Sequence, residues 1–360
     1  MKVMHLETGR HLYGGALQVF YLLRGLHAQG VENVLVCSRG SDIGRAAADY
    51  AEVIEIPMAG DIDPRFGLGL GQAIKATRPD ILHVHSRRGA DWWGGLLARR
   101  FGVPALVTRR VDNPESRVVA SFKYGLYDRV ASISQGICQV LRQAGVADEK
   151  LTLIHSAVDL ERYRQPADRA WFAAEFGLAP QEKTVGVFAQ MIPRKGHRTL
   201  LQAAAKILAA APATRFIFFG KGPLRQELET FCREIGVEKQ VLFAGFRDDL
   251  HRVFPNLDVL AHPAQMEGLG VSLLQAAAAG VPIVAGRAGG IPEVVADGDN
   301  GYLLDPFDVE GFAERISRLL TDPELAQVLG EGGKRKSEAF SIAAMVTGYE
   351  KLYAEMIASV

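Results

Sequence analysis

The sequence contains few cysteines and no excess of charge of either sign. Its three cysteines, Cys37, Cys138 and Cys232, are odd in number and far apart, which argues against a disulfide framework or a cysteine metal site. The 41 basic residues balance 41 acidic ones, so no strongly basic nucleic-acid-binding surface is expected. We therefore expect a cytoplasmic protein without a nucleic-acid partner.

Long apolar segments are also missing. The N-terminal segment 1–9 contains one cation and no apolar stretch long enough for a signal peptide. No later apolar run approaches the roughly 20 residues that span a bilayer. Any membrane contact is therefore expected to be peripheral.

Short apolar runs instead alternate with helical patterns, such as 17–28 and 92–100, along a chain of 360 residues of which 48% are hydrophobic. This length exceeds what one core usually holds, so two domains are expected. The alternation is typical of a doubly wound parallel α/β sheet. The predicted strands cover 3–6, 34–37, 81–84, 105–107, 130–133, 184–189, 215–219, 241–243, 259–261 and 282–284.

The alternation stops between residues 155 and 166, which we interpret as a linker. It separates an N-terminal domain, 1–165, from a second domain, 166–340. In such sheets ligands bind outside the carboxyl ends of the strands, so two facing domains would enclose a cleft. The stretch 343–357 has apolar residues at helical spacing, and its pattern by itself indicates a packing face.

An acid, two glycines and a glutamine occur where a loop is expected to become a helix, in the segment EGLGVSLLQA at 267–276. A helix start has backbone N–H groups without partners and a partial positive charge, and glycine lets a ligand approach the main chain. The segment suits an anionic, hydroxyl-rich ligand, with Glu267 accepting from sugar hydroxyls. A capping or solvated glutamate is the alternative interpretation.

Two cations, Arg194 and Lys195, lie in a second predicted strand-to-helix turn. They could stabilise negative charge on a phosphate, Lys195 as a point charge and Arg194 as a fork on two oxygens. Gly14 and Gly15, which open the first predicted helix, could present N–H groups to the same diphosphate. A solvated pair of cations and a purely structural glycine turn are the alternatives.

In this order, the segments resemble the donor half of glycosyltransferase family 4, retaining enzymes of the GT-B fold that use nucleotide sugars. The resemblance rests on PRKGH at 193–197, GKGP at 220–223, EGLG at 267–270, GGIPE at 289–293 and DNGY at 299–302. The turn at 14–16 and the connection at 153–163 also resemble family segments. The resemblance implies two Rossmann-like domains facing across a cleft, with a C-terminal helix, 341–360, packing back on the first domain.

The resemblance also implies site residues. The catalytic residues would be Glu267, Lys195, Arg194 and His85. The donor would be bound by Gly14, Gly15, Gln190, Gly222, Phe246, Arg247, Gly268, Leu269, Gly270, Val271 and Gln275. Two positions depart from the family. Gln275 replaces the second acid of a Glu-x7-Glu pair, which holds the ribose, and an amide offers one acceptor and two donors. Gln190 replaces an arginine, whose charge Arg194 could supply.

His83 and His85 lie at the end of a predicted strand, where residues of equal parity share a face. They could bind a metal, but no third ligand is close in sequence, and satisfied structural histidines are the alternative. The resemblance makes His85 the one nearer the cleft, where it could polarise the acceptor or the donor. At position 110, where the family often carries a histidine, the chain has Arg110.

Arg110 belongs to a local group of cations near Trp92 and Trp93. The group consists of Arg87, Arg88, Arg99, Arg100, Arg109, Arg110, Arg117, Lys123 and Arg129. Arg87, Arg109 and Arg110 are our candidates for the acceptor side, where they could recognise a phosphorylated or carboxylated acceptor. The group could instead rest on an anionic membrane. Scattered solvated arginines and core tryptophans would explain it equally well.

The resemblance implies a retaining enzyme that moves a sugar from a nucleotide diphosphate sugar to a hydroxyl of a glycolipid, lipopolysaccharide or polysaccharide, at the inner face of the cell membrane. No metal or other cofactor is expected, because Arg194, Lys195 and helix starts can carry the leaving-group charge. Three alternatives stay open: a catalytically silent nucleotide-sugar-binding protein, suggested by Gln190 and Gln275, a nucleotide-sugar epimerase, and a nucleotide hydrolase.

Overall fold

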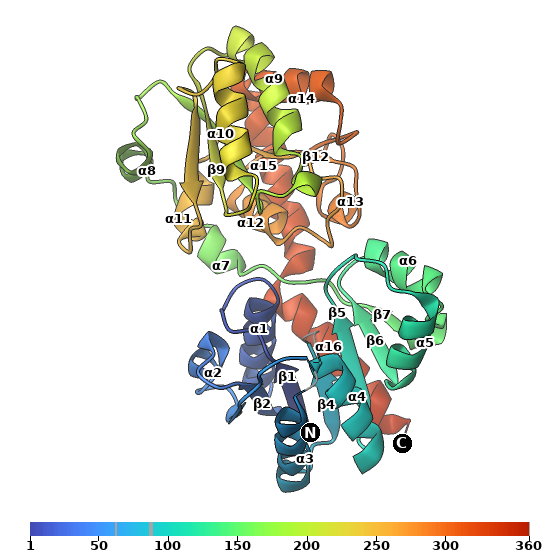
Figure 1. Ribbon diagram of the computed structural model, residues 1–360. Helices are drawn as coiled ribbons and strands as arrows, with labels where there is room; N and C mark the ends of the chain where they lie inside the picture. Colours follow the sequence, from blue (N-terminus) through green and yellow to red (C-terminus); the bar gives the residue numbers. More distant parts are fainter. Residues whose placement is uncertain (62, 86–88, 360) are drawn as a thin grey trace. The chain divides into compact units, whose positions relative to one another are not determined.

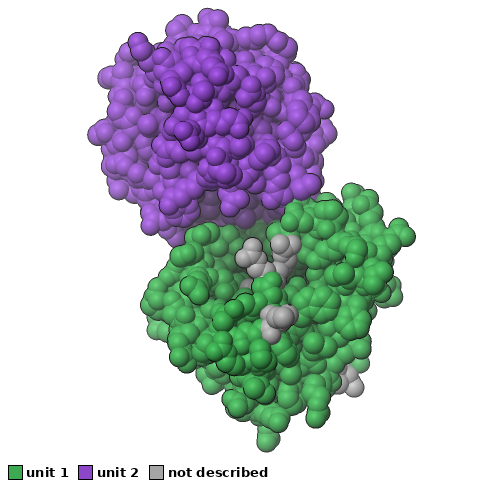
Figure 2. Space-filling view, viewed as in Figure 1, with its two compact units in different colours: residues 1–157, 342–360 green, residues 158–341 purple. Residues whose placement is uncertain are grey.

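The protein is described from a computed structural model, which covers residues 1–61, 63–85 and 89–359. The chain forms two compact units (Figures 1 and 2). Unit 1 comprises residues 1–157 and 342–360, and unit 2 comprises residues 158–341. The first boundary falls inside the segment interpreted as a linker. Among the described residues, no helix is both long and apolar enough to cross a membrane.

Unit 1 contains a sheet of seven parallel strands in the order β3-β2-β1-β4-β5-β6-β7. The strands are β1 (Lys2–Glu7), β2 (Glu32–Ser38), β3 (Glu52–Ile56), β4 (Ile81–Val84), β5 (Ala105–Arg109), β6 (Arg129–Ser132) and β7 (Leu151–Leu153). The strand order reverses between β1 and β4. In doubly wound sheets this reversal creates the crevice in which ligands bind, outside the carboxyl ends of the two strands.

Helices flank this sheet (Figure 1). They are α1 (Gly15–Ala28), α2 (Asp42–Ala46), α3 (Pro64–Thr77), α4 (Ala90–Phe101), α5 (Arg117–Gly125), α6 (Gln135–Gln143) and the C-terminal α16 (Ile342–Ala358), with a short 3-10 helix at Asp148–Lys150. One face of α16, including Met345, Tyr349 and Met356, packs with Tyr21 and Leu22 of α1 in a buried apolar cluster. The last helix of the chain is therefore part of the core of unit 1.

Unit 2 repeats the same architecture with six parallel strands in the order β10-β9-β8-β11-β12-β13. The strands are β8 (Lys183–Phe188), β9 (Thr214–Phe219), β10 (Val241–Gly245), β11 (Val259–His262), β12 (Ile283–Gly286) and β13 (Gly301–Leu304). The helices are α7 (Leu160–Tyr163), α8 (Arg169–Phe176), α9 (His197–Ala210), α10 (Arg225–Glu234), α11 (Leu250–Val253), α12 (Val271–Ala279), α13 (Ile291–Val294), α14 (Val309–Thr321) and α15 (Pro323–Ser337). Short 3-10 helices lie at Pro193–Lys195, Phe254–Asn256 and Glu338–Phe340. The order reverses between β8 and β11.

The central strands are buried apolar runs, as expected for parallel sheets covered on both faces. In both β1 and β8, five of the six residues are buried. The α/β class and the two Rossmann-like parallel sheets predicted from the sequence are thereby confirmed. The strands that the apolar pattern did not indicate, β3, β7 and β13, are all edge strands, where less of each strand is buried.

All four helices that follow the strands at the reversals are preceded by glycines. The residues before α1, α4, α9 and α12 are Gly14, Gly89, Gly196 and Gly270, and no side chain in the described part of the chain caps these helix starts. By contrast, Ser116 and Asp308 cap α5 and α14 through their side chains. Uncapped helix starts at the carboxyl edge of each sheet leave backbone N–H groups for water or a ligand.

Candidate functional site

The loop between β11 and α12 carries Glu267 at the strand-order reversal of unit 2. β11 ends at His262, and Gly270 precedes α12 in the left-handed conformation, with φ of 90°. The backbone N–H of Gly268 donates to Glu267 Oε1 over 3.2 Å. The carboxylate therefore lies beside the uncapped start of α12, as the sequence predicts.

Lys195 lies against this loop from the short 3-10 helix that follows β8. Its Nζ lies 2.7 Å from Glu267 Oε2, and the two side chains are only 11% and 19% exposed. A β-carbon at Gly196 would lie 1.9 Å from the carbonyl oxygen of Pro263. Glycine is therefore required at this position for the loops after β8 and β11 to meet. Two residues that the sequence suggested separately form one ion pair.

His262 joins this pair. Its Nε2 lies 3.0 Å from Glu267 Oε2, and because an ionised carboxylate can only accept, the imidazole donates. Burial by itself would raise the pKa of Glu267, but the hydrogen bond and charge of His262, together with Lys195, lower this pKa to about 2. Glu267 is thus a carboxylate at neutral pH, suited to accept hydrogen bonds. Sequence reasoning missed His262, whose signal was its place as the last residue of a buried strand.

Backbone hydrogen bonds join three loops around the ion pair. The N–H of Gln265 donates to the carbonyl oxygen of Arg194 over 2.9 Å, and the N–H of Met191 donates to that of Lys221 over 3.0 Å. Arg194 Nη1 also contacts Met266 Sδ at 3.2 Å. The loops after β8, β9 and β11 therefore form one carboxyl-edge cluster.

The remaining predicted donor residues of unit 2 differ in exposure. Gln190 is exposed in the loop after β8, and Gly222 is half-buried in the loop after β9. Leu269 and Gly270 are buried, while Gly268 and Val271 are half-buried. Gln275, the replacement for the family's second acid, is 7% exposed in the middle of α12. Of these seven residues, Gln190 alone is exposed, three are half-buried and three are buried.

Phe246 and Arg247, which follow β10, are placed differently. Phe246 is 50% exposed. Arg247 donates to both carboxylate oxygens of Asp249, at 2.8 and 2.5 Å, and also pairs with Glu175. The hydrogen bond to Asp249 raises the pKa of Arg247. A nucleotide base could contact Phe246 directly, whereas Arg247 would first have to leave two acidic partners.

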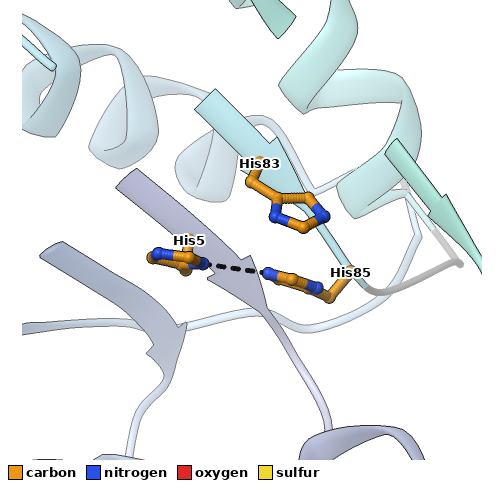
Figure 3. Close-up of side chains that lie close together, drawn as sticks. All are labelled: His5, His83 and His85. Carbon is orange, nitrogen blue, oxygen red and sulfur yellow. Dashed lines mark hydrogen bonds between the residues drawn. The ribbon is translucent and has the colours of Figure 1, made fainter. Parts of the chain in front are cut away.

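Three histidines lie together at the strand-order reversal of unit 1 (Figure 3). His5 on β1 and His83 on β4 are partners in the strand register, and His85 follows β4. His5 Nδ1 lies 3.0 Å from His85 Nε2. Burial lowers the pKa of His5 to about 3, and burial followed by nearby positive charge lowers the pKa values of His83 and His85. All three imidazoles are therefore neutral at neutral pH.

The fold thus supplies from β1 the third histidine that the sequence did not reveal. Candidate ligand atoms of the three rings lie within 4.8 Å of one another. However, His83 already bonds Tyr353 OH at 2.6 Å through Nδ1 and Thr108 Oγ1 at 2.7 Å through Nε2. A metal ion would have to displace these bonds and the His5–His85 bond. The donor set therefore fits a hydrogen-bonded network better than a metal site.

Gly14, Gly15 and Arg110 meet at the same edge of unit 1. Gly14 has φ of 57°, and a β-carbon at Gly15 would lie 3.4 Å from Arg110 Cδ. The Arg110 side chain thus lies against the first turn of α1, within van der Waals distance of a β-carbon at this position. Its Nη1 is 3.5 Å from Ser156 Oγ, a long contact for a hydrogen bond. The structure brings the predicted glycine turn and one predicted acceptor-side arginine together.

Arg109, the second predicted acceptor-side residue, is held within its own loop. Arg109 is 3% exposed and donates to Glu115 and to the carbonyl oxygens of Val111 and Asn113. It stabilises its own loop, because a buried guanidinium needs partners. Arg87 lies outside the described residues.

Lys123, another member of the sequence's cationic group, is also buried. It is 3% exposed and pairs with Glu115 and Asp91. The group of cations near the tryptophans is therefore not one continuous solvated patch, since two of its members are neutralised in the interior.

Comparison with known families and proteins matches both units. Residues 13–162 match the family described as Glycosyltransferase Family 4, and residues 169–336 match Glycosyl transferases group 1. The chain is 26% identical over 288 residues to N-acetyl-alpha-D-glucosaminyl L-malate synthase of Bacillus anthracis, covering 77% of this chain and 75% of that protein. It is 28% identical over 391 residues to D-inositol 3-phosphate glycosyltransferase of Corynebacterium efficiens, covering 99% and 90%.

The structure is also similar to a solved one, that of Anabaena HepE in complex with UDP and glucose. The TM-score is 0.83 at 21% sequence identity, with 100% of both chains covered. At this identity the likeness concerns the fold, and it confirms the GT-B class. With a family match in each unit and glycosyltransferases among its relatives, the chain belongs to the family 4 type of GT-B glycosyltransferases.

Proposed function

We propose that the protein transfers a sugar from a nucleoside diphosphate sugar to an acceptor hydroxyl with retention of the anomeric configuration. The observation that carries this proposal is the buried contact of Lys195 with Glu267, to which His262 also donates. It lies at the strand-order reversal of unit 2, beside the uncapped start of α12. A cation, a hydrogen-bond-accepting carboxylate and backbone N–H groups at one edge suit a diphosphate and a sugar together.

The chemistry breaks the bond between the anomeric carbon and the diphosphate oxygen, so negative charge grows on the leaving phosphate. Lys195 and Arg194 would stabilise that charge, together with the N–H groups at the starts of α9 and α12. Glu267 would accept hydrogen bonds from the sugar. The acceptor oxygen would attack on the face that the diphosphate leaves, passing its proton to a leaving phosphate oxygen. No protein nucleophile is assigned, and His85 would polarise a substrate hydroxyl.

We propose that the transfer needs no metal ion. The support is the positive charge that the protein itself brings to the edge of unit 2, from Lys195, Arg194 and the helix starts. Such fixed charges perform the charge stabilisation that a divalent ion supplies in other transferases. The test is whether donor consumption persists in excess chelator.

For the acceptor, we propose a hydroxyl of a glycolipid, lipopolysaccharide or polysaccharide at an anionic membrane surface. The support is α5, which begins at Arg117 and whose Val118 and Phe122 are 81% and 63% exposed. Apolar side chains next to cations suit the interface of anionic lipids. Phe122→Ser should weaken co-sedimentation with anionic vesicles, whereas equal binding to neutral vesicles or an unchanged variant would contradict the membrane contact.

Two of the relatives point to a second acceptor class. Their names contain L-malate and D-inositol 3-phosphate, which are small anionic compounds that carry hydroxyls. A small anionic acceptor is therefore the alternative to a glycolipid. Testing both classes with the same donor separates these proposals, since only one of them should accelerate nucleotide release.

The experiment that tests the donor site is a thermal-shift panel with UDP, GDP, ADP and their sugar conjugates, with and without magnesium. A ligand that binds the folded state raises its melting temperature. We expect a selective shift that is lost in Lys195→Ala and Glu267→Ala and kept in Lys206→Ala, which removes the same charge from an exposed position in α9. If no nucleotide shifts the wild-type protein at millimolar concentration, the proposed donor site is wrong.

Catalysis is tested separately from binding. Donor consumption that needs an acceptor, with an α-configured donor giving an α-linked product by NMR, would support retaining transfer. Binding without turnover for any acceptor would instead indicate a silent binding protein. Isomerisation of the donor alone would indicate an epimerase, and acceptor-independent cleavage would indicate a hydrolase.

A further inference from the structure

Arg110 has one edge of its guanidinium without a partner. Its Nε and Nη2 atoms are buried and form no hydrogen bond within the described part of the chain, while Nη1 has a 3.5 Å contact with Ser156 Oγ. Nε–H and Nη2–H point in the same direction and form the fork that binds two oxygens of a carboxylate or phosphate. The adjacent Arg109 is fully paired with Glu115 and two carbonyl oxygens. The missing partners are therefore specific to Arg110.

Arg110 lies close to a second positive group. Its side chain lies against Gly15, at the start of α1, and the first turn of α1 contains no acidic residue. A helix start carries about half a positive charge, so two positive groups face each other there. Among the described residues, no carboxylate lies within 4.0 Å of the Arg110 guanidinium.

The nearby histidines do not compensate this charge. His5, His83 and His85 are all buried, and their neutral rings bond to one another, to Thr108 and to Tyr353. His85 Nδ1 has no partner within the described part of the chain and is a further buried polar atom at this edge. A buried guanidinium without a counter-charge is costly, because burial removes its hydration. An anion from outside the chain would remove that cost.

We propose that Arg110, the first turn of α1 and Ser156 form an oxyanion site that binds a phosphate or carboxylate group of a substrate. Nε and Nη2 would donate to two oxygens, and the first N–H groups of α1 would donate to the same group. The group has two possible sources, and assigning it to either rests on the proposed transferase function. It is the diphosphate of the donor or an anionic group on the acceptor, and Arg110 is in either case a specificity-determining residue.

The first test uses inorganic phosphate as the probe on the full-length protein in phosphate-free buffer. Because Arg110→Gln removes a half-buried charge that has no ion pair among the described residues, the ligand-free variant should melt about 2 °C above the wild type. Phosphate should raise the melting temperature of the wild type and not that of Arg110→Gln. Arg100→Gln, which removes the same charge from an exposed position in α4, should retain the wild-type response.

A loss of phosphate binding in Arg110→Gln could also result from misfolding of that variant. A second variant and a second measurement exclude this explanation. Arg110→Lys keeps the charge but loses the two-pronged edge, so its phosphate affinity should fall about tenfold, as expected for one lost charge-assisted hydrogen bond. The 31P line width of phosphate should broaden with the wild type and stay sharp with Arg110→Gln. A lower melting temperature for ligand-free Arg110→Gln, with an equal phosphate response in all proteins, would overturn the oxyanion site and make Arg110 structural.

Competition between phosphate and nucleotides distinguishes the donor diphosphate from an anionic group of the acceptor. If UDP, GDP or ADP removes the phosphate response and binds Arg110→Gln more weakly, the site holds the donor diphosphate. If the phosphate response persists at saturating nucleotide, the site holds an anionic group of the acceptor. An Arg110-dependent phosphate response in a protein that binds no nucleotide would support the oxyanion site and contradict the proposed donor site, so the two proposals can fail independently.

Discussion

Both units have a strand-order reversal in their sheet. The two reversals differ in whether the charged side chains there form ion pairs. In unit 2, the reversal between β8 and β11 contains the Lys195–Glu267 pair at 2.7 Å, with His262 as a further donor at 3.0 Å. In unit 1, the reversal between β1 and β4 contains three neutral histidines and Arg110, for which no carboxylate among the described residues serves as counter-charge.

This difference shows that topology places a site without deciding its electrostatics. The carboxyl ends of neighbouring parallel strands bring polar residues together in both units. In unit 2 the resulting charges compensate one another, so the geometry is held by the protein alone. In unit 1 the hydrogen bonds of the histidines are internal and Arg110 has no ion pair among the described residues, so we expect that edge to be more sensitive to anions.

The largest effect is expected from breaking the compensated centre in unit 2. Lys195→Ala removes a charge proposed to face the leaving phosphate, so the rate of donor consumption should fall about 10²- to 10³-fold, the usual loss for one such group. Lys206→Ala is the matched control on α9 and should leave the rate unchanged. Equal rates in both variants would show that Lys195 does not face the reacting phosphate.

The histidine network of unit 1 should respond next most strongly. Tyr353→Phe removes the hydroxyl that lies 2.6 Å from His83 Nδ1 and leaves that buried nitrogen without its partner. The free energy of unfolding should fall by about 1 to 3 kcal/mol, measured by urea denaturation. Tyr349→Phe is the control, because its hydroxyl bonds Thr108 and leaves both contacts of His83 in place, so a smaller loss is expected.

As the pH falls, the histidines of unit 1 should lose their contribution to stability before Glu267 in unit 2 does. The buried His197 of unit 2, whose pKa burial lowers to about 4, adds to the loss below pH 6.5. The folded-state pKa of His5 is about 3, below its ordinary value of 6.5, so the unfolded chain binds the proton first as pH falls. Stability is therefore complete above pH 6.5 and decreases below it, by about 1.4 kcal/mol per pH unit for each such histidine. Glu267, whose folded-state pKa is about 2, loses its contribution only between about pH 4.5 and pH 2.

Urea denaturation at pH 7.5, 6.5 and 5.5 measures this slope. In His5→Asn, the loss of unfolding free energy between pH 6.5 and 5.5 should be smaller than in the wild type by about 1 kcal/mol, because one titrating group is gone and its unfolded form is only partly protonated at pH 6.5. A slope identical to that of the wild type would show that His5 does not remain neutral in the folded protein.

The smallest effect is expected from the contact between Arg110 and Ser156. Ser156→Ala should change the unfolding free energy by less than about 0.5 kcal/mol, because the 3.5 Å separation is too long for a strong bond. Chemical denaturation in phosphate-free buffer provides the measurement. A loss comparable to that of Tyr353→Phe would mean that Ser156 holds Arg110 more firmly than its distance indicates, and would reduce the contrast between the two units.

The sequence predicted the central strands well and the edge strands poorly. Residues 3–6 and 184–189 are continuous apolar runs because β1 and β8 are covered on both faces. β3 was not indicated, because it carries Glu52 and Glu55 and lies at the edge of its sheet, where less burial is required. The predicted loop-to-helix turns at Glu267 and Lys195 are also found, since glycine and charge at a strand end are visible in the local sequence.

By itself, the sequence determined the α/β class, the glycine-opened helix starts and most residue types of the donor loop, because these depend on local apolar periodicity and backbone freedom. The tertiary structure alone decided which charges meet. His262 reaches Glu267, His5 joins His83 and His85, and Arg109 becomes buried while the edge of Arg110 stays unpaired. These relationships depend on strand order and register, which join residues far apart in sequence, so no local pattern could have revealed them.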